Sequence, residues 1–187
     1  YKRQLLAYSE TAEHLDKQWC VTCHGPGGNT TSNQFPKLAG QSHEYFIAQM
    51  KAFRDKSRAD KNAERFMWGI ASRLTDKEIE DLAFYYESQS REHSKKINDQ
   101  AKYELGQSIF TKGKLDKGVP ACAACHGDKG QGLASVPEIA GQNETYIKRQ
   151  LNVFYGNERP SAIAMHEIVK NLTQEEIEAI AEYLQSQ

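Results

Sequence analysis

The chain contains the same pattern twice, and this internal repeat constrains its fold more than any other feature. A Cys-x-x-Cys-His motif begins at Cys20 and again at Cys122. The segment 36–41 (PKLAGQ) recurs as 137–142 (PEIAGQ). Two copies of a unit of about ninety residues are too few and too long for a solenoid, so we predict two tandem domains of the same fold.

Other landmarks of the repeat keep their order in both halves. They are Tyr45, Gln49, Phe53, Arg58 and Leu74, which match Tyr146, Gln150, Phe154, Arg159 and Leu172. A polar, charge-rich stretch separates the copies and has the composition of a linker. We therefore predict an N-terminal domain over residues 1–92, a linker at about 87–102 and a C-terminal domain over 100–187.

The periodicity of both halves predicts an all-α fold. Residues 75–78 (TDKE) and 173–176 (TQEE) are capping boxes, and each opens a segment with apolar residues at helical spacing. The segments 45–53 and 146–155 are predicted to form a helix in the middle of each domain. No segment shows the alternation typical of a strand.

Composition narrows the class of protein. The formal net charge is −1, which gives no support to nucleic-acid binding. No apolar run is long enough to span a membrane. Only 39% of residues are hydrophobic, which is little for two separate cores. A large apolar cofactor bound in each half would therefore help to stabilise that half. All four cysteines lie in the two motifs, so none remains for a structural disulfide.

The motif itself predicts covalently bound haem. On a helical turn the two cysteines, at positions i and i+3, lie on one side and both reach one macrocycle through thioether bonds. The histidine that follows, His24 or His126, turns its imidazole to the iron. Zinc binding and a redox dithiol are the alternatives. The repetition of the motif within the same downstream pattern weighs against both, and no paired Cys or His supplies zinc with a fourth ligand.

The repeat also selects the second iron ligand. Met67 and Met165 match, because each lies seven residues before its leucine, so we predict His/Met ligation at both irons. Met50 matches Leu151 and is predicted to fill the core. His166, next to Met165, is the rival ligand. The other histidines have no partner in the repeat and are predicted to be surface or hydrogen-bonded residues: His14, His43 and His93.

Further pairs are expected to surround the haems. Pro36 and Pro137 follow the two histidines at nearly the same distance. Their carbonyl oxygens would accept a hydrogen bond from the proximal ring, and the less favoured alternative is that both prolines belong to plain loops. Leu38 and Ile139 are expected to pack on the haem face.

Charged residues near the predicted sites differ between the halves. Arg58 and Arg159 would contact haem propionates, brace the methionine loop or lie in solvent. The stretch 51–66 holds six basic and three acidic residues, whereas 152–164 holds one of each. Positive charge favours the reduced iron, so this difference alone predicts a higher potential for the N-terminal haem, although water and salt screen exposed charges.

These motifs together resemble those of class I c-type cytochromes, and specifically the tandem di-haem cytochrome c4 family of bacteria. The resemblance covers nearly the whole chain from about Ala12. It implies two cytochrome c domains, each wrapped around one haem c, with Cys20, Cys23, His24 and Met67 at one site. Cys122, Cys125, His126 and Met165 match the other.

The same resemblance implies a periplasmic electron carrier, soluble or loosely associated with the membrane. Its expected partners are a cytochrome bc1-type donor and a terminal oxidase, with no small-molecule substrate and no nucleic acid. Two alternatives remain: a di-haem subunit of a larger oxidoreductase such as a flavocytochrome, and a di-haem peroxidase. One departure concerns packing: Gly106 has no glycine counterpart in the first domain, where Ala12 and Leu15 are the candidate substitutes.

Overall fold

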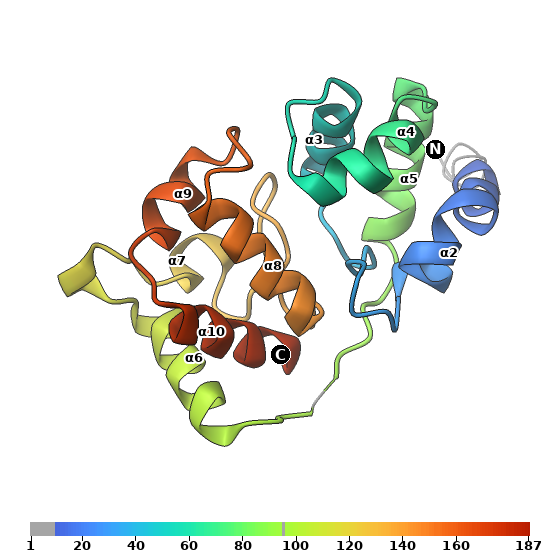
Figure 1. The fold of residues 1–187 in the computed structure, drawn as a ribbon. Helices are drawn as coiled ribbons and strands as arrows, with labels where there is room; N and C mark the ends of the chain where they lie inside the picture. The colour runs from blue at the N-terminus through green and yellow to red at the C-terminus, as the bar shows by residue number, and fades with distance from the viewer. Residues whose placement is uncertain (1–9, 95) are drawn as a thin grey trace. The chain divides into compact units, whose positions relative to one another are not determined.

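The structure is a computed structural model that describes residues 10–94 and 96–187, and it forms two compact units (Figure 1). The first, unit 1, ends at Glu92, and unit 2 spans His93–Gln187. The extension formed by residues 1–9 lies outside the described residues.

Every regular element in the described ranges is helical, and β-pairing is limited to two isolated bridges, both in unit 2. The prediction of an all-α fold is confirmed. No helix in this part of the chain has both the length and the apolar character needed to cross a membrane.

Unit 1 begins with a helix that runs without a break from residue 10 to residue 24. Its middle is a π-helical turn, η1, and its end is α2. A second π-helical turn, η3, leads into α4. The elements of unit 1 after residues 10–15 are η1 (Asp16–Cys20), α2 (Val21–His24), η2 (Pro26–Gly28), α3 (His43–Arg54), η3 (Ala63–Met67), α4 (Trp68–Ala71) and α5 (Asp76–Glu87).

Unit 2 repeats the order of the α-helices, but its described residues hold no counterpart of the two π-helical turns or of η2. Its first helix and the helix of its Cys-x-x-Cys-His motif are separated by a loop, instead of being continuous. The elements are α6 (Gln100–Lys112), η4 (Leu115–Lys117), α7 (Ala123–His126), α8 (Glu144–Tyr155), α9 (Ile163–Val169) and α10 (Gln174–Gln185).

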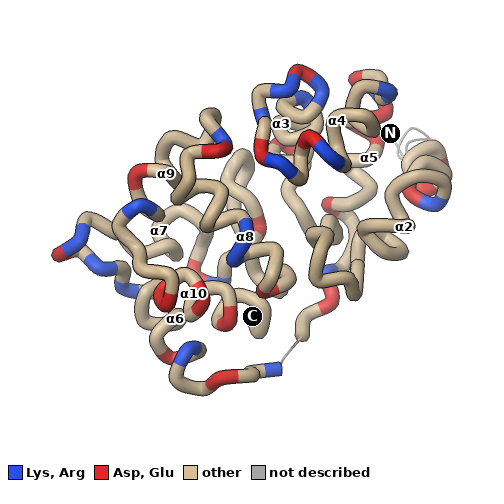
Figure 2. The backbone as a smooth tube through the Cα atoms, in the orientation of Figure 1, with Lys and Arg blue, Asp and Glu red and all other residues tan. Residues whose placement is uncertain are grey.

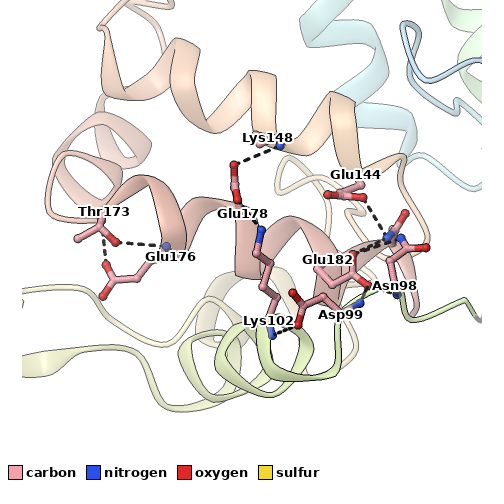
Figure 3. Close-up of polar contacts among 10 residues, drawn as sticks. Asn98, Asp99, Lys102, Glu144, Lys148, Thr173, Glu176, Glu178 and Glu182 are labelled. Atoms are coloured by element: carbon pink, nitrogen blue, oxygen red, sulfur yellow. Dashed lines mark hydrogen bonds and ion pairs between the residues drawn. The ribbon is translucent and has the colours of Figure 1, made fainter.

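Local sequence explains where the last helix of each unit begins. The Thr75 side chain accepts a hydrogen bond from the backbone N–H of Glu78, and the Glu78 carboxylate accepts one from the Thr75 N–H. Thr173 and Glu176 make the same reciprocal pair at the start of α10 (Figure 3). Both predicted capping boxes are therefore present.

In unit 2 the first and last helices, α6 and α10, pack closely (Figure 1). A Cβ atom at Gly106 would lie 2.0 Å from the Ala179 carbonyl oxygen, so only glycine permits this approach. The Phe110 ring packs against Tyr183, with 5.2 Å between ring centroids. In unit 1, Ala12 is fully buried in the core and Leu15 packs against the same core, so both candidate substitutes for the glycine lie there.

The polypeptide between α5 and α6 is anchored at both ends. Arg91 is buried and donates from Nε to the Ala39 carbonyl oxygen at 2.8 Å, within unit 1. In unit 2 the buried Glu182 carboxylate of α10 accepts hydrogen bonds from the backbone N–H groups of Asn98 and Asp99, where α6 begins (Figure 3). The predicted linker is thus partly incorporated into each unit.

Candidate haem sites

Each Cys-x-x-Cys-His motif ends on a helical turn. In unit 1 the helix stops at Gly25 with φ at 73°, and in unit 2 it stops at Gly127 with φ at 79°. Glycine adopts this left-handed region without strain. All four cysteines are free thiols, so both pairs are available for bonds to a cofactor.

The histidine of each motif is held by the same kind of hydrogen bond. His24 Nδ1 lies 2.9 Å from the Pro36 carbonyl oxygen, and His126 Nδ1 lies 3.0 Å from that of Pro137. A carbonyl oxygen only accepts, so Nδ1 carries the proton and Nε2 keeps its lone pair. This arrangement fixes the ring and presents Nε2 to a metal.

The loop that carries each proline is closed in the same way. In unit 1 the backbone N–H of Leu38 donates to the Gly28 carbonyl oxygen at 2.8 Å, and in unit 2 that of Ile139 donates to Gly130 at 2.8 Å. The loop is also tied to the last helix, because the Gly40 N–H donates to the Tyr86 carbonyl oxygen. These hydrogen bonds hold the backbone that follows each proline.

Matching apolar residues lie beside the core of each unit. Met67 is partly buried and packs against the core of unit 1, and Met165 does so in unit 2. The same is true of other predicted site residues, namely Cys20 and Leu38 in unit 1 and Cys122 and Ile139 in unit 2. The structure thus brings the thiol, the loop residue and the methionine of each predicted site onto one core.

An aromatic contact connects the two sides of the site in unit 1. The Phe35 ring lies 6.1 Å from the His24 ring and 5.3 Å from that of Phe66, which precedes Met67. The histidine and methionine segments are therefore neighbours in space, although some forty residues separate them in the sequence.

His166 is directed elsewhere. Its Nδ1 lies 2.6 Å from the Phe154 carbonyl oxygen and its Nε2 lies 2.6 Å from that of Arg159. Both ring nitrogens thus face backbone carbonyls, which leaves neither for a metal. Met50 lies in the core of unit 1, as predicted.

Arg58 braces the segment that leads to Met67. Its side chain is buried, with Nη1 donating to Gln49 Oε1 at 3.0 Å and the guanidinium 4.5 Å from the centre of the Phe53 ring. Its Nε donates to the Asp60 carboxylate at 3.2 Å, and Asp60 in turn accepts from the N–H of Ala63, where η3 begins.

Arg159 has the same surroundings in unit 2. It is buried, donates to Gln150 Oε1 at 3.2 Å and lies over the Phe154 ring. These contacts explain why glutamine, phenylalanine and arginine recur together in the sequence. Both arginines are buried, so neither is the solvated residue of the three alternatives.

Burial sets the protonation of the site residues. It raises the pKa of the Cys20 and Cys122 thiols to about 11, so both are protonated at neutral pH. A reactive redox dithiol has a thiol of lowered pKa, which is the opposite of the shift at Cys20 and Cys122. Burial also lowers the pKa of His24 and His126, against the raising effect of the proline carbonyls. Both rings are therefore neutral at pH 7, the form that binds iron.

The sequence did not reveal every residue near the first site. Asp16 is buried four residues before Cys20, and its carboxylate accepts a hydrogen bond from the Tyr86 hydroxyl at 2.6 Å. Asp16 has no acidic counterpart in the second half of the chain, so the repeat does not mark it as a site residue. Its position one helical turn before Cys20 was the available signal.

The residues present fit a covalently attached haem in each unit. The donor set offers two thiols for thioether bonds, a neutral imidazole with a free Nε2 and a thioether sulfur from methionine, all beside an apolar core.

Comparison with known proteins agrees with this chemistry. The family model described as cytochrome c matches residues 9–90 and again 103–187. Cytochrome c-552 of Acidithiobacillus ferridurans is 39% identical over 168 residues, which cover 89% of this chain and 73% of that protein. A thiosulfate dehydrogenase electron acceptor of Stutzerimonas stutzeri is 32% identical over 170 residues, covering 88% and 76% of the two chains.

A solved structure of cytochrome c4 from Acidithiobacillus ferrooxidans superimposes with a TM-score of 0.84 at 39% identity, and the match covers 90% of this chain and 98% of that one. Both the repeated family match and this likeness over the full length agree with the two Cys-x-x-Cys-His units. The chain therefore belongs to the cytochrome c family, and within it to the di-haem cytochromes c4, which are electron-transfer proteins with two haem c groups and not enzymes.

Proposed function

We propose that His24 and Met67 are the axial ligands of one iron and that His126 and Met165 are those of the other. Cys20 and Cys23 hold the first haem and the Cys122–Cys125 pair the second. The observation that carries this proposal is the matched hydrogen bond from each histidine Nδ1 to a proline carbonyl, which leaves Nε2 available in both units.

This ligand set suits an electron carrier. When bound, each haem supplies one-electron chemistry, because its iron changes between the ferric and ferrous states. The chain's own contribution is to keep two strong ligands in place in both states. Arg58 and the Asp60 carboxylate hold the methionine segment of unit 1, and the proline carbonyl orients the histidine.

We further propose that the protein works in the periplasm, where it passes electrons between components of a respiratory chain. A cytochrome bc1-type donor and a terminal oxidase are the proposed partners. Its contacts with them are transient and small, at the low end of interface sizes. The family membership of the chain supports this role.

Haem counting tests the attachment sites. Denaturing electrophoresis should leave a band that stains for haem peroxidase activity, and a pyridine haemochrome assay should give two haems per chain. The double substitution Cys20→Ala with Cys23→Ala should leave one haem, held by unit 2. A wild-type count of one or none, or two haems in the double variant, contradicts the proposed sites.

Carbon monoxide tests the ligation. The reduced native protein should bind it poorly, because both irons already have two protein ligands. Fast stoichiometric binding together with peroxide turnover would instead identify the peroxidase alternative.

A second candidate function is that of a cytochrome subunit serving a dehydrogenase. The likeness to a protein named as a thiosulfate dehydrogenase electron acceptor favours it. Purified thiosulfate dehydrogenase with thiosulfate should then reduce this protein at a rate that saturates with its concentration. A flavoprotein that copurifies with the chain would indicate the flavocytochrome form of this candidate.

A further inference from the structure

A buried carboxylate distinguishes the first haem site from the second. Asp16 is 2% exposed, and its Oδ1 accepts a hydrogen bond from the Tyr86 hydroxyl at 2.6 Å. Its Oδ2 accepts from the Tyr85 hydroxyl at 3.3 Å and from the backbone N–H of Gly27 at 3.4 Å. These three donors are neutral, so they stabilise the negative charge without cancelling it.

The fold places this charge beside the haem attachment point. Asp16 and Cys20 are the first and last residues of the π-helical turn η1, where the backbone N–H of Val21 donates to the Asp16 carbonyl oxygen. Residues about one helical turn apart lie on the same side of a helix. Cys20 packs against the core cluster that contains Tyr86, whose hydroxyl binds the Asp16 carboxylate.

His24 ends the same helix, which runs without a break from residue 10 to residue 24, so the buried carboxylate and the proposed iron ligand belong to one element.

Unit 2 has an apolar residue at the matching place. The repeat aligns Tyr86 with Leu184, since each lies twelve residues after the leucine at its capping box, Leu74 or Leu172. Leu184 is 2% exposed and belongs to the core of unit 2. A leucine cannot donate a hydrogen bond to a buried carboxylate, so unit 2 lacks the shorter of the two tyrosine hydrogen bonds that hold Asp16, although Tyr183 matches Tyr85.

We propose that the Asp16 carboxylate lowers the reduction potential of the haem held at Cys20–His24, and thereby sets it below that of the haem in unit 2. This inference rests on the proposed haem attachment and ligation. Reduction adds one negative charge to the haem, which a fixed negative charge nearby disfavours.

This effect opposes the surface charge of unit 1 and should exceed it. From the last turn of α3 to η3, basic residues are interspersed with acidic ones along the chain (Figure 2), and Lys51, Lys56, Lys61 and Arg65 are exposed. The buried Arg58 is paired with Asp60 and contributes no net charge. Water and salt screen exposed charges over about 8 Å at physiological ionic strength, whereas a buried charge is screened much less.

The test compares variants that remove or keep the charge. Asp16→Asn keeps an acceptor for Tyr86 but removes the charge, and Asp16→Glu keeps the charge. Glu13→Gln is the matched control, because it removes a carboxylate from the same helix that is exposed and paired with Lys17. Each protein is titrated potentiometrically at low and high salt. The titration curve has one step for each haem. The variant Met165→His shifts the potential of the unit 2 haem and so shows which step belongs to which haem.

We expect Asp16→Asn to favour reduction of the unit 1 haem by three- to tenfold, which is about 28 to 59 mV at 59 mV per tenfold for one electron. The shift should persist at high salt, and the unit 2 haem should not move. Asp16→Glu should stay close to wild type, and Glu13→Gln should shift less, with the shift lost at high salt. If the Asp16→Asn protein does not incorporate haem, Asp16→Ser is the charge-removing variant that is compared with Asp16→Glu.

An unchanged potential in Asp16→Asn overturns the inference, as does an equal shift of both haems. Equal shifts in the Asn and Glu variants also overturn it, because packing and not charge would then be the cause. Haem content and the far-red methionine–iron band of the wild type are measured first. Their absence refutes the proposed function, whereas their presence with an unmoved potential refutes only the role of Asp16.

Discussion

Trp68 and His166 follow the two methionines and make the same contact with different side chains. Trp68 Nε1 donates to the Arg58 carbonyl oxygen at 2.9 Å, and His166 Nε2 lies 2.6 Å from that of Arg159. An indole and an imidazole thus both anchor the residue after the methionine to the backbone of the buried arginine. The residue type changed between the units while the contact was kept.

Replacing either methionine tests the ligation one residue at a time. Met67→Ala and Met165→Ala should each remove about half of the weak far-red absorption band that methionine–iron bonds give in the oxidised protein, because each removes one of two equivalent ligands. Met50→Leu is the control and should leave the band intact, since Met50 lies in the core. Loss of the band in the control would show that the repeat was aligned wrongly.

Arg58→Leu should destabilise unit 1. The substitution leaves the buried Asp60 carboxylate without its charged partner, and breaking a buried pair in this way costs about 3–5 kcal/mol. Denaturant unfolding of the holoprotein measures the loss. Arg54→Leu is the matched control, because the Arg54–Asp76 pair is exposed, and its effect should be much smaller. Equal losses in both variants would contradict the bracing role of Arg58.

At the scale of elements, the sequence predicted those helices that carry a local signal. The segments 45–53 and 146–155 lie within α3 and α8, and both capping boxes are formed. The π-helical turns η1 and η3 were not predicted. A π-turn inserts one extra residue into a helix, and apolar spacing over so few residues does not reveal it. These turns end at Cys20 and Met67, two of the predicted haem-binding residues.

Every residue of the proposed sites is a prediction from the sequence, because each belongs to a matched pair. It could not decide between the three roles of Arg58, since burial depends on contacts with Gln49 and Phe53 from a different helix. Nor could it reveal the Asp16–Tyr86 pair, which joins residues seventy positions apart and occurs in one half only.

Gly106→Ala should weaken the packing of α6 on α10. The new methyl group would lie 2.0 Å from the Ala179 carbonyl oxygen, so the helices must move apart. Overpacking of this kind costs about 1–3 kcal/mol and more where backbone must shift. Denaturant unfolding of unit 2 reports the loss.

Gly69→Ala provides the control for that experiment. Gly69 lies in α4, and nothing would lie within 4 Å of a Cβ atom there. Alanine favours the helix by about 1 kcal/mol over glycine, so this variant should be at least as stable as the wild type. A similar loss in both variants would mean that helix packing is not the reason for Gly106.

At the scale of the whole molecule, the segment without anchoring contacts between the units is shorter than the predicted linker at about 87–102. Arg91 and the Glu92 carbonyl oxygen are bound to residues of unit 1, and the N–H groups of Asn98 and Asp99 are bound to Glu182 of unit 2. The polar composition of 87–102 did not reveal these anchors, because polar residues serve equally in linkers and in caps. We propose that the domains keep the limits 1–92 and 100–187.

Limited proteolysis tests the extent of the linker. Trypsin should cut the native holoprotein after the exposed Lys96 and spare Arg91, whose guanidinium is buried against the Ala39 carbonyl. The two fragments should each retain one haem, as measured by haem stain and mass spectrometry. Early cleavage after Arg91 would show that this part of the linker is not anchored as described.

The contact between each histidine and a proline carbonyl has a genetic consequence. The acceptor oxygen belongs to the main chain, so no missense mutation at position 36 or 137 deletes it. Such a change alters only the rigidity that the proline ring gives to the loop. Substitution of either proline can therefore tune this hydrogen bond by moving the loop but cannot remove its acceptor, and weakening the carbonyl oxygen directly requires chemical synthesis of a backbone ester.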